Sequence, residues 1–204
     1  MEQYQGKDIC LSVFNKENII DRGTRSICYR KGDKVLKVMS GFVNENAANE
    51  VVEEMTNSRN TLVHWLGEYV TPSQIEMSGK TGSFQVVIEQ PFISGMSLKK
   101  AIELAERDNL NIDRIIDFLK RTQNMYKSTN QVPDIFGRPH VLGWYQGFST
   151  PNVRVELNGG ILFPKLLDIG FARLSLNKIT KSIHNSLLAK SIDVAIEKTK
   201  NRVM

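Results

Sequence analysis

The hydrophobic pattern of the 204-residue chain changes its period near residue 93. Up to this point apolar and polar residues alternate in short runs, which is typical of strands that are buried on one face. These runs cover residues 9–13, 26–30, 34–39, 73–77 and 83–89. After residue 93, apolar residues recur in steps of three and four, which is the period of an amphipathic helix. Residues 153–157 and 161–167 are the exception, because with Asn158-Gly159-Gly160 between them they predict a hairpin. Strands in the first half and helices in the second half predict an α+β fold.

One helix is expected among the strands. Residues 44–55 are rich in helix formers, and the side chain of Asn44 can cap the first turn. A turn at Lys31-Gly32-Asp33 joins two of the strands before the helix, and a turn at residues 79–82 joins the two strands after it. The part before the change of period is therefore expected to form a five-stranded antiparallel sheet with one helix, and the part after it to be mostly helical. The expected division of the chain is 1–90, 91–95 and 96–204.

The composition is that of an ordinary folded protein, because 41% of the residues are hydrophobic and 24% are charged. No apolar run reaches the roughly 18 to 20 residues that a membrane span needs, and the first residues form no apolar signal region. We therefore expect a cytoplasmic protein that makes no use of a membrane. Cys10 and Cys28 are too few for a disulfide framework or a cysteine-rich zinc site, so we expect both to be small core side chains.

Much of the net charge of +5 comes from basic residues near the C-terminus. These residues are Lys178, Lys181, Lys190, Lys198, Lys200 and Arg202. Apolar residues recur at helical spacing in the same segment, at Leu176, Ile179, Ile183 and Leu187. The pattern predicts an amphipathic C-terminal helix whose basic face lies in solvent. The alternative is that this face binds nucleic acid, because a basic balance suits any partner that carries phosphate.

A second strong feature is an apolar run, Phe163 to Leu167, that ends in Asp168-Ile169-Gly170. The simplest interpretation is a turn, because buried strands often end in Asp-x-Gly. The alternative is a metal ligand, because protein-kinase-like enzymes use the aspartate of such a triplet to hold a nucleotide-bound Mg²⁺. Asp168 is therefore the first candidate metal ligand.

Lys37 lies within the third expected strand and has apolar residues on both sides. A lysine that contacts phosphates needs a fixed carboxylate to stay aimed at them. Glu50 and Glu54 are four residues apart and share one face of the expected helix, whereas Glu53 lies off that face. We expect one of the two to pair with Lys37 and prefer Glu50. The alternative is a lysine on an edge strand that points into solvent.

Two further segments are candidates to contact a nucleotide. In the connection after the last expected strand, residues 90–98 resemble the hinge of kinase-like phosphotransferases. This resemblance implies that the carbonyl of Pro91 and the N–H of Ile93 bind the edge of an adenine base. Proline is harmless at the first of these positions, because only its carbonyl is needed there. An ordinary connection between a strand and a helix is the alternative. Between the first two expected strands, a candidate phosphate loop contains Gly23, Thr24, Arg25 and Ser26.

Asp134, in Val132-Pro133-Asp134-Ile135, is the candidate for a residue that aligns an acceptor hydroxyl. In protein kinases a metal-binding Asn follows the corresponding Asp by five positions, and Pro139 stands at that place here. Asn152, which precedes an expected strand, is the displaced counterpart, so residues 135–151 form an insertion. Either Asp134 folds back into place around the insertion, or the chain has no catalytic aspartate. A turn aspartate after proline is the alternative.

Taken together, these segments resemble the protein-kinase-like superfamily in a compact, atypical bacterial or phage form. The resemblance covers roughly residues 7–175. The chain departs from the family pattern in having one glycine in the phosphate loop, no His-Arg-Asp, a displaced Asn, Ile169 in place of Phe, and no Ala-Pro-Glu. The resemblance implies a two-lobed fold, with a five-stranded antiparallel small lobe that has one helix, a hinge, and a reduced, mostly helical large lobe.

The resemblance also implies an ATP-dependent phosphotransferase that moves the γ-phosphoryl group to a hydroxyl of a protein or small-molecule acceptor. Lys37 would then contact the α- and β-phosphates, and Asp134 would align the acceptor. Asn152 and Asp168 would hold Mg²⁺. The alternative is a pseudokinase, which keeps the fold as a nucleotide- or protein-binding module without transferring phosphate. A third interpretation is an unrelated α+β protein whose basic C-terminal helix binds nucleic acid.

Overall fold

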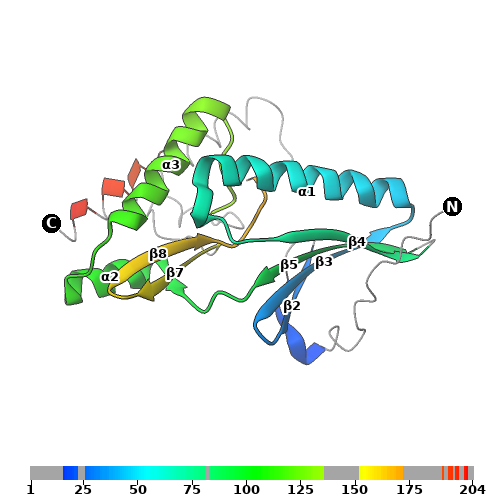
Figure 1. Ribbon diagram of the computed structural model, residues 1–204, viewed down its shortest axis with the longest axis horizontal. Coiled ribbons are helices and arrows are strands. Elements are labelled where there is room, and N and C mark those ends of the chain that lie inside the picture. Colours follow the sequence, from blue (N-terminus) through cyan, green and yellow to red (C-terminus); the bar gives the residue numbers. More distant parts are fainter. Residues whose placement is uncertain are drawn as a thin grey trace. The chain divides into compact units, whose positions relative to one another are not determined.

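The computed structural model describes residues 16–22, 26–80, 83–135 and 152–171, together with residues 190, 193, 194, 196, 197, 200 and 201. Within these residues the protein has a five-stranded antiparallel sheet, a three-stranded sheet and three α-helices (Figure 1). This confirms the α+β class that the change of period predicts.

The chain divides into two compact units. The first comprises Met1–Arg59 and Pro72–Phe92, and the second comprises Asn60–Thr71 and Ile93–Met204. Residues 60–71, which the expected division places with the strands, belong to the second unit. They do so because the Tyr69 ring packs edge-on against Phe118 and the N–H of Thr71 bonds to a strand of that unit.

The strands of the first unit form one antiparallel sheet in the order β1-β2-β3-β5-β4. Their bounds are Ile19–Arg22 (β1), Ile27–Lys31 (β2), Lys34–Phe42 (β3), Gln74–Lys80 (β4) and Ser83–Pro91 (β5). A short 3-10 helix, Lys16–Asn18 (η2), precedes β1, and helix α1, Glu45–Leu66, follows β3. The expected antiparallel sheet of five strands with one helix is therefore confirmed.

The first strand differs from the expectation. The run 9–13 lies outside the described residues, and β1 is formed by residues 19–22, where the sequence predicts a loop. Ile19 pairs with Tyr29 of β2, and Ile19 and Ile27 both pack against the core of the sheet. The pairing with β2 and this burial decide the position of β1, because its sequence shows no alternation.

The two faces of the sheet follow from its register. On one face lies a buried cluster of Tyr29, Leu36, Val38 and Val87, with Ile19 and Ile27 against it. Directly opposite residues of an antiparallel ladder point to the same face, and successive residues point to opposite faces. On the other face Lys37 therefore stands between its partners Cys28 and Ile88, and the next row pairs Met39 with Val86.

Helix α1 begins where the sequence predicts. Asn44 Oδ1 accepts a hydrogen bond from the N–H of Ala47 over 2.8 Å, which satisfies one of the open donors of the first turn. In the part of α1 that belongs to the first unit, Ala48 and Ser58 are buried. Figure 1 shows this helix running along the sheet.

The second unit contains helices and a small sheet. Its elements are η3 (Gly67–Tyr69, a 3-10 helix), β6 (Met96–Ser97), α2 (Leu98–Asp108), α3 (Asp113–Thr129), β7 (Val153–Asn158) and β8 (Ile161–Leu166). Strands β6, β7 and β8 are antiparallel neighbours in that order. Gly159 and Gly160 join β7 to β8 at φ values of 57° and 81°, which confirms the hairpin that Asn158-Gly159-Gly160 predicts.

The core of the second unit lies between its helices and the hairpin. Ser97 Oγ caps α2 by accepting a hydrogen bond from the N–H of Lys100 over 3.4 Å. Fully buried side chains come from all of these elements, at Leu98, Ile102, Ile115, Phe118, Val155, Leu162 and Leu166. The apolar residues that recur at helical spacing between residues 98 and 119 therefore point into this core.

The remaining expectations concern the cysteines, the C-terminus and the membrane. Cys28 is buried, as expected, and Cys10 lies outside the described residues. Most of the expected C-terminal helix also lies outside them, at Leu176, Lys178, Ile179, Lys181, Ile183, Leu187, Lys198 and Arg202. Lys190 and Lys200 are helical and exposed. In the part of the chain that the structure describes, no helix combines the length and the apolar character needed to cross a membrane.

Candidate functional site

Residues that the sequence singles out meet in the second unit. Asn152 Nδ2 donates a hydrogen bond to the main-chain oxygen of Asp134 over 2.7 Å. The N–H of Asp134 donates in turn to the main-chain oxygen of Gly170 over 3.0 Å. Beside this bond, Pro133 and Phe171 pair as an antiparallel bridge. The main chain of Asp134 is therefore held from both sides.

Asn152 and Asp168 lie at the same end of the β7–β8 hairpin. Val153 and Leu166 are the last cross-strand pair of the hairpin. Beyond this pair, the N–H of Leu167 donates to the main-chain oxygen of Asn152 over 2.8 Å. The chain therefore enters β7 at Asn152 close to the point where it leaves β8 toward Asp168. Both residues are half-buried.

The hydrogen bonds orient the side-chain oxygens of these two residues. The partner of the Asn152 amide is a carbonyl oxygen, which only accepts, so the NH₂ group must face it and Oδ1 must face away. Asp168 Oδ1 accepts a hydrogen bond from the N–H of Gly170 over 3.0 Å, which fixes the carboxylate against its own turn. Within the described residues, Asn152 Oδ1 and Asp168 Oδ2 make no further hydrogen bond. Two oxygen acceptors thus lie at one end of the β7–β8 hairpin.

Such a pair of oxygens fits one class of metal. Amide and carboxylate oxygens are ligands for hard cations, and Mg²⁺ in phosphate-transferring enzymes is held by one or two protein oxygens together with phosphates and waters. Among the described residues, no three His, Cys, Asp or Glu side chains gather around a common point. Oxygens of these two types are compatible with Mg²⁺ that arrives with a phosphate ligand.

The contacts of Asp134 bear on one alternative that the sequence leaves open. The chain returns Asp134 to the neighbourhood of Asn152 and Asp168, although residues 136–151 between them lie outside the described residues. These contacts involve the main chain of Asp134, and the residue is half-buried. The role of its carboxylate stays a prediction.

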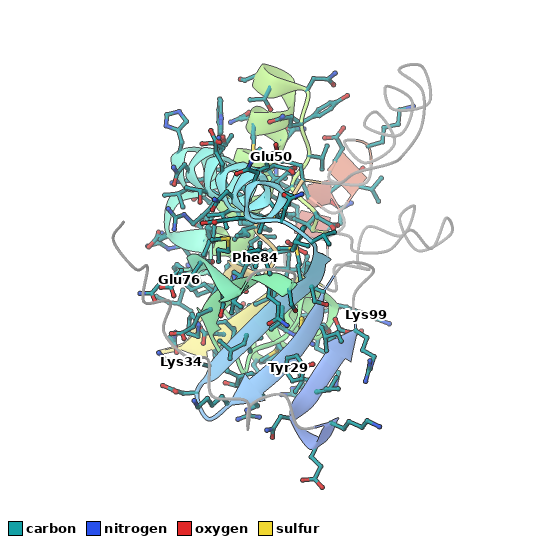
Figure 2. The ribbon with its side chains drawn as sticks, turned by 90° about the vertical axis from the view of Figure 1, so that its right-hand side faces the viewer. Tyr29, Lys34, Glu50, Glu76, Phe84 and Lys99 are labelled. Atoms are coloured by element: carbon teal, nitrogen blue, oxygen red, sulfur yellow. The ribbon has the colours of Figure 1, made fainter. Side chains whose placement is uncertain are left out.

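Lys37 is the candidate phosphate lysine of the first unit. It is half-buried on β3, and its neighbours Leu36 and Val38 are buried on the opposite face of the sheet. On α1, Glu54 is half-buried whereas Glu50 is exposed. Figure 2 labels Glu50 on α1, and the sheet below this helix carries Phe84 and Tyr29. Burial therefore favours Glu54 as the partner of Lys37, although the sequence favours Glu50.

The end of β5 presents the carbonyl of Pro91 in a defined direction. Pro91 stands opposite Lys34 of β3, and the N–H of the following residue, Phe92, donates to the main-chain oxygen of Asp33 over 2.6 Å. Because carbonyls of successive residues in a strand point to opposite sides, the carbonyl of Pro91 faces away from β3. On that side, the pairing with β4 ends at Glu89. The carbonyl of Pro91 is therefore a hydrogen-bond acceptor just beyond the last residue pair of β4 and β5.

The remaining candidates are the residues of the phosphate loop and Ile93. Gly23, Thr24 and Arg25 lie outside the described residues, and Ser26 is half-buried directly before β2. Ile93 is half-buried and belongs to the second unit, whereas Pro91 belongs to the first.

Two contacts near these positions have no simple signal in the sequence. The main-chain oxygen of Gly170 holds Asp134, and a main-chain contact leaves no trace in residue type. The guanidinium of Arg30 lies 3.8 Å from the centre of the Phe92 ring, beside Pro91. An arginine on a strand is compatible with many surroundings, so only the register of β2, β3 and β5 reveals this stack.

No family model matches this chain, and no curated protein matches it. Function is therefore inferred from the geometry of the residues themselves.

Proposed function

We propose that the protein is an ATP-dependent phosphotransferase with a protein-kinase-like fold. The observation that carries this proposal is the bond between Asn152 and the main chain of Asp134, next to the turn of Asp168. It puts an amide oxygen, a carboxylate oxygen and an acidic loop residue together, and these are the groups that the resemblance assigns to metal binding and acceptor alignment. The element order of the first unit, three strands, one helix and two strands, supports the fold assignment.

The proposed roles follow from the chemistry of each group. Asn152 Oδ1 and Asp168 bind Mg²⁺, and Lys37 contacts the phosphates of the nucleotide. When bound with ATP, Mg²⁺ neutralises charge that develops on the transferred phosphoryl group. The carboxylate of Asp134 accepts a hydrogen bond from the acceptor hydroxyl and aligns it for in-line attack on the γ-phosphorus. The carbonyl of Pro91 accepts from the amino group of the adenine base.

A pseudokinase is the second candidate function. The observation that favours it is the pair Val132 and Pro133, both buried, at the positions where the family pattern has His and Arg before the loop aspartate. In this case Asn152 and Asp168 still bind Mg²⁺ with the nucleotide, and Asp134 has no chemical role. The acceptor, whether a protein or a small molecule, is needed only by the enzyme.

Thermal unfolding with and without Mg·ATP tests the proposal. Ligand that binds the folded state raises its stability by mass action, so millimolar Mg·ATP should raise the unfolding temperature of the parent protein. Asp168→Ala should weaken this effect. Asp108→Ala is the matched control, because Asp108 is exposed at the end of α2 and its ion pair among the described residues is with the adjacent Arg107. An unfolding temperature of the parent protein that does not change with Mg·ATP would contradict both the kinase and a pseudokinase that binds nucleotide.

A further inference from the structure

A buried tyrosine is locked into the second unit by a hydrogen bond to a charged group. Tyr69 is 0% exposed, and its hydroxyl donates to Asp117 Oδ2 of α3 over 2.7 Å. The same oxygen accepts from Arg121 Nε over 2.8 Å, and the Arg121 guanidinium lies 5.6 Å from the centre of the Tyr69 ring. The acceptor of the tyrosine hydroxyl is therefore itself held in place by a cation one helical turn away.

The ring of Tyr69 joins α3 to strand β8. It packs edge-on against Phe118 of α3, with ring centres 5.6 Å apart, and at a tilt of 35° against Phe163 of β8, with centres 5.3 Å apart. Lys165 of β8 lies over the same Phe163 ring and donates to the main-chain oxygen of Glu68 over 2.8 Å. The carboxylate of Glu68 bonds in turn to Arg114 of α3 over 2.5 Å.

Residues 67–71 thus bridge α3 and β8, and they reach the end of β8 that leads to the candidate metal ligands. The N–H of Thr71 donates to the main-chain oxygen of Leu166 over 3.0 Å, and Val70 pairs with Leu166 as a parallel bridge. Leu166 is the last residue of β8, and the next residue, Leu167, bonds to the main-chain oxygen of Asn152 over 2.8 Å. Val70 and Thr71, the two residues after Tyr69, therefore link it to this end of β8 through their main chain.

We propose that Tyr69, through its hydrogen bond to Asp117, is a positioning residue for the metal-binding oxygens of Asp168 and Asn152. This inference rests on the proposed function. The hydroxyl holds residues 67–71 against α3, these residues hold the end of β8, and the end of β8 sets where the two oxygens lie. Metal ligands need their geometry held within about 0.5 Å, so a looser strand end weakens metal binding without removing a ligand.

The test compares Tyr69→Phe with a matched loss of another buried hydroxyl. Thr122 is buried on the same helix, α3, and its Oγ1 donates to the main-chain oxygen of Phe118 over 2.9 Å, without a bond to β8. Thr122→Val therefore removes a buried hydroxyl from α3 and leaves residues 67–71 in place. The measurement is the Mg²⁺ concentration that gives half of the stabilisation by ATP, taken from thermal unfolding at fixed ATP.

The expected result separates positioning from general stability. Both variants unfold at a lower temperature, but only Tyr69→Phe raises the half-saturating Mg²⁺ concentration, by about tenfold, the lower end of what loss of an outer partner of a metal ligand causes. Stabilisation by ATP without Mg²⁺ stays equal in all three proteins. If Tyr69→Phe fails to fold, Asp117→Asn replaces it, because an amide oxygen still accepts from the hydroxyl but loses the charge that Arg121 holds. A smaller rise in the same direction is then expected.

The outcomes distinguish failure of the positioning role from failure of the proposed function. An unchanged half-saturating Mg²⁺ concentration in Tyr69→Phe, or in Asp117→Asn where that variant is needed, overturns the positioning role and leaves the proposed function standing. An equal rise in Thr122→Val also overturns it, because the effect would then follow from lower stability alone. A parent protein without any Mg²⁺-dependent stabilisation overturns the proposed function and this inference together.

Discussion

The side chain of Asn152 is bonded through its amide nitrogen to the main-chain oxygen of Asp134, which lies 18 positions earlier in the chain, over 2.7 Å. One side chain thereby does two things. Its nitrogen bonds to the loop that carries Asp134. In the proposed function, its oxygen binds Mg²⁺ together with Asp168. A change at Asn152 can therefore separate metal binding from the placement of the loop.

Substitutions at Asn152 should show this separation. Asn152→Asp keeps an oxygen ligand and loses the donor. Stabilisation by Mg·ATP should therefore be retained while phosphoryl transfer falls, because one of the two bonds that hold the main chain of Asp134 is lost. Asn152→Ala loses both groups, so both properties should decline. Thermal unfolding with Mg·ATP and turnover of labelled ATP measure the two effects. Loss of stabilisation in Asn152→Asp equal to that in Asn152→Ala would contradict the assignment of Oδ1 to the metal.

Asp134→Asn distinguishes the enzyme from the pseudokinase. The substitution should abolish phosphoryl transfer, including slow ATP hydrolysis and autophosphorylation, because the carboxylate is assigned to the acceptor. Nucleotide binding should stay nearly intact, because the contacts of this residue with Asn152 and Gly170 are made by its main chain. Equal turnover in the variant and the parent would favour the pseudokinase.

The two glutamates of α1 provide an internal comparison. Glu54 is half-buried and Glu50 is exposed, so Glu54→Gln should weaken ATP binding more than Glu50→Gln, through a less firmly held Lys37. Exposed ion pairs contribute only about 0–1 kcal/mol, and we expect Glu50→Gln to fall in that range. Titration of ATP against both variants measures the difference. A larger effect at Glu50 would restore the preference that the sequence supports.

Gly95 leaves no room for a side chain. A Cβ atom at this position would lie 2.6 Å from the main-chain oxygen of Val155, and backbone atoms cannot rotate away. Gly95→Ala should therefore push β6 from β7 and destabilise the second unit by about 1–3 kcal/mol. For a chain of this size, each kcal/mol lowers the unfolding temperature by roughly 2–4 °C. Ser94→Ala, at the exposed neighbouring position, is the control and should leave the unfolding temperature unchanged.

Tyr69 should contribute to stability in a pH-dependent way. Burial, and then the hydrogen bond to Asp117, raise the pKa of its hydroxyl, whereas Arg114 lowers this pKa. Because the folded pKa lies above the ordinary value of about 10, the contribution is fully present below about pH 10 and is lost as the pH rises through the raised pKa. The difference in free energy of unfolding between the parent and Tyr69→Phe should thus stay constant from about pH 6 to 9.

At higher pH this difference should shrink. A hydrogen bond to a charged acceptor contributes about 1.5–3 kcal/mol, and we expect a difference of this order at neutral pH. Denaturant unfolding of both proteins at several pH values measures it, and the lysines that also titrate at high pH are common to both. A difference that changes between about pH 6 and 8 would point to another group.

Local signals in the sequence were enough for several elements. The caps at Asn44 and Ser97 are bonds to N–H groups three residues away, and the β7–β8 turn depends on two adjacent glycines. Such contacts lie within a few residues, so residue type and spacing predict them. Strand β1 had no such signal. Its four residues do not alternate, and only pairing with β2 and packing of Ile19 made them a strand.

The sequence by itself determined the α+β class, the strand alternation that separates Lys37 from its apolar neighbours, and the residue types of the candidate site. The tertiary structure alone decided that Asp134 returns to Asn152, and that Glu54 and not Glu50 is half-buried on α1. The return of Asp134 depends on main-chain bonds from Gly170 and a side-chain bond from Asn152, and main-chain groups are the same in every residue. The choice between the glutamates depends on how α1 is rotated about its axis against the sheet. The positions of Glu50 and Glu54 in the sequence are compatible with either choice, and only packing selects one.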